Sequence, residues 1–344
     1  MTELFAITPL DRSLEPALRA ALDGKAKPPG SLGRIEDLAV KIGLIQQSLT
    51  PKLDRCRLLL FAGDHGLTHS GVSSYPASVT VAMVQTLLAG KASASAFAAA
   101  IGAEVAVIDA GVAADLAPHP ALIDAKVAPG TADAAVEPAM TRDQALLALN
   151  RGAAIARQSA ADGFDVLALG EMGIGNSASA ALLLHRLGPL PLDRAVGVGA
   201  GQSAEGLARK HAALDRAAAR SAATEPLEVL AQFGGFEIAM MAGAILGAAG
   251  TGAVVVVDGF IATSAALVAA RLAPACLDHC VFAHRSAEAG HAAMLAILEA
   301  EPLLNLDMRL GEGTGALLAV PLLRAAAALL SQVASLEDVL EGRL

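Results

Sequence analysis

The chain has 344 residues, of which 54% are hydrophobic, 17% are charged and 3% are aromatic. This composition excludes intrinsic disorder, because disordered chains are rich in charge and poor in apolar side chains. The formal net charge of −9, without a basic stripe or interleaved aromatic residues, argues against a nucleic-acid partner. A single anionic ligand stays compatible with this charge, since a few backbone amides can hold one phosphate.

Short apolar runs recur along the chain and predict strands. They are continuous rather than alternating, which is typical of strands covered on both faces in a parallel sheet. The runs are residues 57–62, 104–109, 165–169, 195–198, 253–257 and 280–283, and a further short strand is expected at 121–127, within the long connection 113–141.

Alanine-rich stretches between these runs predict helices at residues 77–88, 142–160, 178–187, 204–220, 263–271 and 287–299. The alternation of strands and helices predicts an α/β fold with a parallel sheet flanked by helices. Residues 14–47 look like two helices without a strand, and residues 315–344 are also helical. We therefore expect a small helical domain from residues 1–55 and 316–344, beside a parallel α/β substrate-binding domain at 56–315.

The uncharged run from Ile238 to Val257 is long enough to span a bilayer. Glycines interrupt it and no Lys or Arg flanks it, so we expect a buried helix and strand rather than a membrane carrier. The N-terminus has no signal-peptide pattern, and three cysteines are an odd, sparse count that favours a reducing compartment. Cys276 and Cys280 are either half of a zinc site or ordinary buried thiols. We expect a cytoplasmic protein that does not bind membranes.

Glycines, acids and histidines gather in the turns that follow the predicted strands. These turns are residues 63–66, 109–111, 170–177, 197–202, 258–259 and 284–286, and a last turn of this kind is residues 309–315. Any one of them can be an ordinary turn, since Gly and Asp favour turns. Open parallel sheets bind ligands at the carboxyl ends of their strands, so the recurrence favours a single ligand site.

The turn at 170–177 predicts a phosphate site, because successive amides at a helix start suit a phosphate and glycines let it approach. It contains Gly173-Ile174-Gly175-Asn176-Ser177. It is neither a Walker loop nor a dinucleotide fingerprint, so no dinucleotide cofactor is expected. Gly199 and Gly201 belong to a second glycine turn, and Lys210 on the following helix either adds a cation to the site or is a solvated helix charge.

Two glutamates, Glu171 and Glu312, stand in glycine-containing turns next to predicted helices. A carboxylate placed this way can act as a general base, and partial burial would raise its pKa from about 4.3. The alternative is a helix cap, since acids are favoured at helix starts. Asp64, His65 and His69 leave a catalytic metal open as a further alternative, although we expect polar contacts without a metal.

Six motifs follow one another between about residue 25 and residue 330. They are Lys27-Pro28-Pro29-Gly30-Ser31-Leu32-Gly33, Gly63-Asp64-His65-Gly66, Gly170-Glu171-Met172-Gly173-Ile174-Gly175-Asn176, Gly235-Phe236-Glu237-Ile238, Val257-Asp258-Gly259-Phe260 and Arg309-Leu310-Gly311-Glu312-Gly313-Thr314-Gly315. Together they resemble the nicotinate-nucleotide–dimethylbenzimidazole phosphoribosyltransferase family, and motifs of this length in this order are highly specific.

The resemblance implies a Rossmann-like parallel sheet with a small helical domain from both chain ends, working as a homodimer. It implies that nicotinate mononucleotide and 5,6-dimethylbenzimidazole are the partners, and that they are converted to α-ribazole 5′-phosphate and nicotinate. That reaction serves assembly of the lower nucleotide loop of cobalamin. No cofactor is implied, because nicotinate attached through its ring nitrogen is already a cationic leaving group.

The resemblance also assigns roles to residues. Glu312 corresponds to the general base of the family and Glu171 to a second active-site carboxylate. The expected substrate-binding residues are Gly173, Ile174, Gly175, Asn176, Gly199, Gly201 and Lys210 for the phosphoribosyl group, Gln85, Ser286 and Leu310 near the base, and Gly313 beside Glu312. The pair Ser177-Ala178 departs from the two hydroxyl residues expected in the family, so the resemblance implies the same chemistry here but leaves one phosphate or ribose hydrogen bond open.

Two other functions stay open from the sequence alone. One is a metal-dependent hydrolase of a phosphorylated small molecule, built on Asp64, His65, Glu171 and Asp258. The other is a nucleotide-sensing module that uses the glycine turns only to bind. The preferred base depends on the shape of the pocket, which the sequence does not give.

Overall fold

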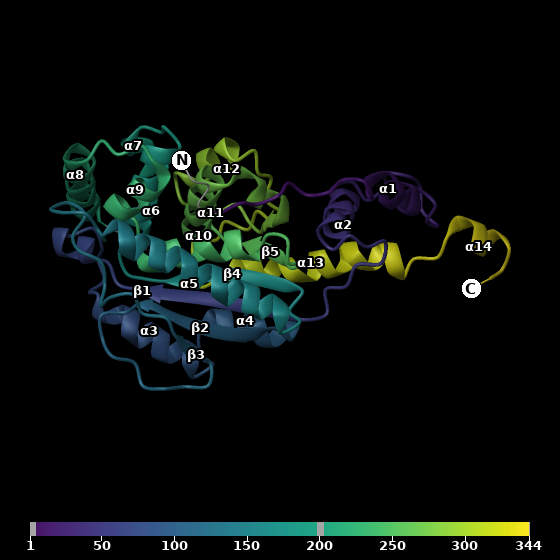
Figure 1. Ribbon diagram of the computed structural model, residues 1–344, viewed down its shortest axis with the longest axis horizontal. Helices are drawn as coiled ribbons and strands as arrows, with labels where there is room; N and C mark the ends of the chain where they lie inside the picture. Colours follow the sequence, from purple (N-terminus) through teal and green to yellow (C-terminus); the bar gives the residue numbers. More distant parts are fainter. Residues whose placement is uncertain (1–4, 198–202, 344) are drawn as a thin grey trace.

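The computed structural model describes residues 5–197 and 203–343. Within these residues a six-stranded parallel sheet has the order β3-β2-β1-β4-β5-β6 (Figure 1). The order reverses between β1 and β4, as in Rossmann-like folds, so the predicted α/β fold with a parallel sheet is confirmed. The strands are β1 (Cys56–Gly63), β2 (Glu104–Gly111), β3 (Leu122–Asp124), β4 (Val166–Met172), β5 (Val254–Val257) and β6 (Cys280–Phe282).

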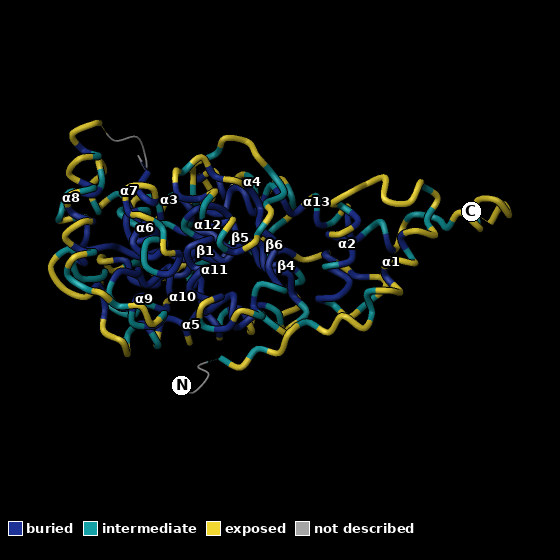
Figure 2. Tube along the Cα trace, turned by 90° about the horizontal axis from the view of Figure 1, so that it is seen from above, coloured by how far each residue is buried: buried dark blue, intermediate teal, exposed yellow. Residues whose placement is uncertain are grey.

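The sheet separates two hydrophobic cores. Side chains alternate between the faces of a strand, so Leu59 and Phe61 of β1 belong to one core and Leu58 and Leu60 to the other. β5 is four consecutive buried valines, and β-branched side chains suit a strand covered on both sides. Figure 2 shows the strands among buried residues, with the exposed positions on outer helices and loops.

The helices divide between the two cores. The core of Leu59 receives side chains from α5 (Arg142–Ala161), α6 (Asn176–Leu187), α7 (Leu192–Ala195), α8 (Ala204–Arg220), α9 (Pro226–Phe233), α10 (Phe236–Ala248), α11 (Phe260–Leu272) and α12 (His291–Ile297). The core of Leu58 receives them from α1 (Glu15–Asp23), α2 (Arg34–Ile45), α3 (Ser78–Leu88), α4 (Ser93–Ile101) and α13 (Thr314–Ser331). Two 3₁₀ helices, η1 (Gly66–Ser70) and η2 (Pro274–His279), and the short helix α14 (Leu336–Leu340) complete the elements of the described chain.

One predicted strand, at residues 195–198, is wrong over its described residues. Ala195 is the last residue of α7, Val196 and Gly197 follow it without regular structure, and Val198 lies outside the described residues. The run is apolar because α7 packs between α6 and α8, not because it pairs in the sheet. The short strand expected at 121–127 is present as β3, whereas α4 and α9 were not predicted.

Segments from the two ends of the chain lie side by side. α13 packs against α1 and α2, and the Lys25 ammonium group donates hydrogen bonds to the carbonyl oxygens of Leu330 and Val333, each at 2.8 Å. In Figure 1 these helices extend away from the sheet and end at α14. The contacts agree with a helical unit built from both ends, while its division from the α/β domain at residues 55 and 316 stays a prediction.

Two helical stretches, Ser78–Ile101 and Thr314–Ser331, are long and apolar enough to cross a membrane by length and composition alone. The first consists of two helices, α3 and α4, and 56% of the second is buried inside the fold. The core helices of soluble proteins pass the same test, so this evidence is weak. The run from Ile238 to Val257 forms most of α10 and the whole of β5, both buried, as expected.

Helices α5 and α10 pack backbone against backbone, and glycine makes this contact possible. A Cβ atom on Gly152 would lie 1.9 Å from the carbonyl oxygen of Met240, and one on Gly243 would lie 2.0 Å from that of Leu149. Interiors are close-packed and transmit such a clash, so any larger side chain would push the two helices apart.

We predict that Gly152→Ala lowers the free energy of unfolding by about 1–3 kcal/mol, because overpacking costs more than the helix propensity that alanine adds. Urea unfolding followed by circular dichroism measures the change. Asn150→Ala, on the exposed side of the same helix, is the control and should not lower stability. Equal stability of Gly152→Ala and the wild type would contradict the close packing of α5 on α10.

Candidate active site

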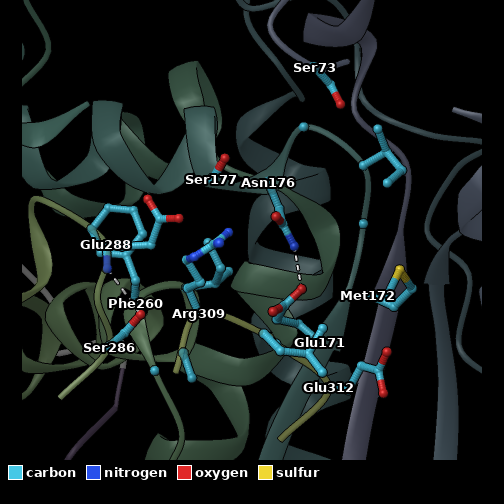
Figure 3. Close-up of a pocket in the computed structure, with 18 of the residues that line it drawn as sticks. Ser73, Glu171, Met172, Asn176, Ser177, Phe260, Ser286, Glu288, Arg309 and Glu312 are labelled. Carbon is cyan, nitrogen blue, oxygen red and sulfur yellow. Dashed lines mark hydrogen bonds between the residues drawn. The ribbon is translucent and has the colours of Figure 1, made fainter. Parts of the chain in front are cut away.

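A pocket lies at the carboxyl end of the sheet, near the point where the strand order reverses (Figure 3). Open parallel sheets bind ligands at such a point. The turns after β4, β5 and β6, the segment before α3, one residue of α8 and the turn before α13 all contribute to it. Its lining consists of residues 72–75, 171–177, 210, 258–262, 286, 288 and 309–312.

The turn between β4 and α6 exposes the start of a helix to the pocket. Gly175 precedes α6 with φ +99°, and no side chain of the described residues caps this helix. Gly173 is equally constrained, because a Cβ there would lie 2.4 Å from the Gly63 carbonyl oxygen. The Ile174 amide donates to Thr80 Oγ1, and the Asn176 and Ala178 amides donate to carbonyl oxygens of the turn. The remaining amides and the positive end of the helix dipole suit an anion such as phosphate.

Lys210 of α8 brings a cation to the same helix start. Its side chain is 1% exposed, and its ammonium group donates to the Ser177 hydroxyl and to the Gly197 carbonyl oxygen, each at 3.1 Å. Burial lowers the pKa of Lys210, while the Glu288 carboxylate acts in the opposite direction. A buried ammonium beside uncapped amides is an arrangement that an incoming phosphate would complete.

Glu171 is the first of three buried carboxylates at the pocket. It lies near the end of β4, and its carboxylate accepts a hydrogen bond from the Asn176 side chain (Figure 3). Gly311 packs directly against it, since a Cβ on Gly311 would lie 2.0 Å from Glu171 Oε1. Burial first, and then the charges of Glu237 and Asp258, raise the pKa of Glu171 to about 8.

Glu312 is held next to Glu171 by the backbone. Its amide donates to the Glu171 carbonyl oxygen at 3.1 Å, and its φ of +65° is a left-handed conformation that costs energy in a non-glycine residue. Its Oε2 accepts from the Ala94 amide at the start of α4, at 3.3 Å. Burial raises the pKa of Glu312, and the Ala94 amide opposes this shift.

Beneath the glycine turn lies a buried ion pair. His65 Nε2 is 2.7 Å from Glu237 Oε1, and the two side chains are 1% and 0% exposed. Burial lowers the pKa of His65, but the neighbouring Glu237 carboxylate outweighs this effect and the pKa is raised overall. His65 therefore acts as the partner of Glu237, and the described residues contain no group of three or more His, Cys, Asp or Glu side chains arranged to hold a metal ion.

Comparison with known proteins identifies the family. Residues 7–339 match a family model described as Phosphoribosyltransferase. The chain is 53% identical over 338 residues to the nicotinate-nucleotide–dimethylbenzimidazole phosphoribosyltransferase of Dechloromonas aromatica (strain RCB), covering 97% of both chains. It is 52% identical over 330 residues to the protein of the same name from Cupriavidus necator, covering 96% of this chain and 95% of that one.

The chain belongs to the nicotinate-nucleotide–dimethylbenzimidazole phosphoribosyltransferase family. Among solved structures, that of CobT from Thermus thermophilus is similar with a TM-score of 0.91 and 43% identity, covering 95% of this chain and 98% of that chain. The resemblance seen in the six motifs is therefore confirmed over nearly the whole length.

Most residues that the sequence assigned to the site of this phosphoribosyltransferase line the one pocket. They are Glu171, Gly173, Ile174, Gly175, Asn176, Lys210, Ser286, Leu310 and Glu312. Gln85 is exposed on α3 and is not part of the lining, and Gly313 is the residue after Glu312, just outside it. Gly199 and Gly201 lie outside the described residues.

Three further charged residues belong to the site without a predicted role. Glu288 and Arg309 line the pocket, and Glu237 pairs with His65 below it. Glu237 stood in one of the six motifs, Gly235-Phe236-Glu237-Ile238, but no role was predicted for it. Arg309 stood in the predicted ligand turn at 309–315 without a role of its own, and Glu288 stood outside the predicted ligand turns.

We predict that Glu171→Gln is more stable than the wild type, and that its advantage grows as the pH rises from about 4.5 to about 8. The folded wild type keeps a proton on Glu171 that the unfolded chain has released, so its stability falls across this window and levels off above it. Urea unfolding at pH 5, 7 and 9 measures the difference. Glu205→Gln on the exposed side of α8 controls for the loss of one carboxylate, and an advantage of Glu171→Gln that shrinks with rising pH would contradict the burial of this group.

Proposed function

We propose that the protein transfers the phosphoribosyl group of nicotinate mononucleotide to 5,6-dimethylbenzimidazole, giving α-ribazole 5′-phosphate and nicotinate. The supporting observation is one pocket that combines an uncapped helix start and Lys210 with the buried carboxylates of Glu171 and Glu312. The names of the relatives that match the chain over nearly its full length agree with this pair of substrates. We place the reaction in assembly of the lower nucleotide loop of cobalamin.

The two ends of nicotinate mononucleotide carry opposite charges, and the pocket has a lysine on one side and acid side chains on the other. The phosphate would bind at the start of α6, on the backbone of the Gly173–Asn176 turn, with Lys210 as its cation. The pyridinium ring would lie toward Glu171 at the other side of the pocket, where its positive charge would favour the ionised form of that side chain. This arrangement fixes one orientation of the substrate and opposes the reverse one.

The chemistry needs little from the protein beyond orientation and one proton acceptor. The pyridinium nitrogen leaves C1′ of the ribose as neutral nicotinate nitrogen, while a ring nitrogen of the benzimidazole forms the new bond from the opposite face and inverts β to α. The benzimidazole then loses its N–H proton, and Glu312 is the proposed acceptor. Holding two flat rings on opposite faces of a ribose is an orientation effect, and effects of this kind can lower a barrier by about 7–11 kcal/mol.

The base would bind where the pocket is apolar. Leu310, Met172, Ile174 and Phe260 contribute apolar surface to the lining, which suits the dimethylbenzimidazole ring system. We propose Ser286 and Leu310 as base contacts, and the role of Gln85 in holding the base stays a prediction. Gly199 and Gly201 are proposed phosphoribosyl contacts, and Gly313 keeps Glu312 in place.

We also propose that the protein works as a cytoplasmic homodimer without nucleic-acid or membrane partners. The net charge argues against a nucleic-acid partner and the scarcity of cysteine supports a reducing compartment, while the homodimer is what the resemblance to the family implies. The reaction requires no cofactor, because the departing ring is already positively charged in the substrate.

We predict that the pure protein releases nicotinate when it is mixed with nicotinate mononucleotide and 5,6-dimethylbenzimidazole. Mass spectrometry of the product measures whether a ribazole phosphate forms, and a panel of other benzimidazoles and purines gives the base preference. Each substrate alone is the control. Release of nicotinate without a base would indicate hydrolysis, and binding without release would indicate a sensing module.

We predict that Glu312→Gln lowers kcat by about 10²–10⁴-fold, which is the range for loss of a general acid or base. The glutamine keeps an oxygen that can accept from the Ala94 amide, so the fold should be retained. Calorimetry should find that nicotinate mononucleotide binds as tightly as to the wild type. Near wild-type turnover of this variant would remove Glu312 from the proposed role.

A further inference from the structure

Asp258 lies at the carboxyl end of β5 and reaches the start of α13. Its side chain is 4% exposed, and its Oδ1 accepts from the Ala316 amide at 2.8 Å. The amides of Gly313 and Gly315 also act on the charge of this carboxylate. Burial raises the pKa of Asp258 to about 7, and these three amides act in the opposite direction.

The start of α13 has no cap of its own. The residue before the helix is Gly313, with φ +78° and no side chain to accept from the first amides. The third residue of a helix normally donates to the side chain of the capping residue, and here Ala316 donates instead to Asp258, which lies 58 positions away in the sequence. Asp258 is therefore the cap of α13, supplied from another element of the fold.

Glu312 lies directly before this capped turn. It has the strained φ of +65°, and its neighbour Gly311 is pressed against the Glu171 carboxylate. A strained residue keeps its conformation only when the surroundings hold it there. Two contacts do so at the backbone: the Glu312 amide donates to the Glu171 carbonyl oxygen on one side, and Asp258 binds the next turn on the other.

The His284 side chain lies next to the Asp258 carboxylate. It is 1% exposed, and its Nε2 is 3.7 Å from Asp258 Oδ1. A Cβ on Gly315 would lie 2.1 Å from the His284 ring, and one on Gly259 would lie 2.9 Å from Nε2. The ring thus fills the space between β5 and α13, so the Asp258 carboxylate has little room to leave the helix start.

We propose that Asp258 is a positioning residue for Glu312: by capping α13 from the end of β5, it holds the Glu312 carboxylate where the base gives up its proton. The inference rests on the proposed transferase reaction. It differs from the view that Asp258, which also lines the pocket, acts on the substrate by its charge. It also differs from a purely structural role, in which the loss of Asp258 would lower stability without a specific effect on turnover.

The test compares Asp258→Ala with Asp258→Asn in the nicotinate-release assay. Asparagine is as good a helix cap as aspartate but carries no charge. Asp258→Ala should lower kcat by about 10²-fold, the cost of a small misplacement of a reacting group, with KM for nicotinate mononucleotide within about threefold of the wild type. Asp258→Asn should turn over at least about tenfold faster than Asp258→Ala.

The decisive measurement is the double variant Glu312→Gln with Asp258→Ala. If Asp258 acts through Glu312, the double variant should be no slower than Glu312→Gln alone, because coupled residues are not additive. The stability control is Thr141→Ala, which removes the Thr141 cap of α5 outside the pocket. It should cost stability of about 1 kcal/mol and leave kcat unchanged.

The positioning role would be overturned if the loss of kcat in the double variant equals the product of the two single losses. It would also be overturned by equal losses of kcat in Asp258→Ala and Asp258→Asn, or by a rise in KM with unchanged kcat. If Asp258→Ala does not fold, Asp258→Leu, which has a similar shape but accepts no hydrogen bond, takes its place in the same cycle and is judged in the same way. If the wild type itself releases no nicotinate, the proposed function fails, and that result is independent of every comparison between variants.

Discussion

Three buried carboxylates at one end of the sheet constrain where the neighbouring helices can lie. A carboxylate that leaves water is costly unless hydrogen bonds replace its solvation. Each of the three receives such a bond: Glu171 from Asn176, Asp258 from the start of α13, and Glu312 from the start of α4. Two of these donors are backbone amides at helix starts, where the helix dipole also favours a negative charge. The positions of α4 and α13 are thus tied to the acids of the pocket.

The glycines around the pocket follow from the same constraint. Gly170, Gly311 and Gly315 each occupy a place where a Cβ would meet a neighbouring group at 2.0–2.6 Å: the Glu312 backbone, the Glu171 carboxylate and the His284 ring, respectively. Larger residues would separate the strand ends from the turn before α13. The glycine-rich motifs of the sequence therefore serve close packing of backbone and carboxylates as well as the approach of a ligand.

The sequence predicted the parallel sheet because its strands are buried on both faces and read as continuous apolar runs. It also predicted that Glu171 and the 170–177 turn would lie at the ligand end, since polar residues followed the strands there. It could not predict that Glu312 accepts from Ala94, 218 positions away, because no local pattern encodes such a contact. The run at 195–198 was misread because an apolar segment packed between helices looks like a strand when its neighbours are unknown.

In the roles proposed for Glu312 and for Asp258, the position of the Glu312 carboxylate matters more than the negative charge of the pocket. During the proposed transfer a positive charge moves from the pyridinium ring to the benzimidazole ring, so carboxylates near both rings stabilise substrate and intermediate to a similar degree. Uniform stabilisation of this kind does not by itself speed a reaction. The step that ends the positive charge is loss of the benzimidazole proton, and only an acceptor in the correct place can make that step easier. In the proposed mechanism, turnover therefore depends on the geometry of the Glu312 turn rather than on the total negative charge of the pocket.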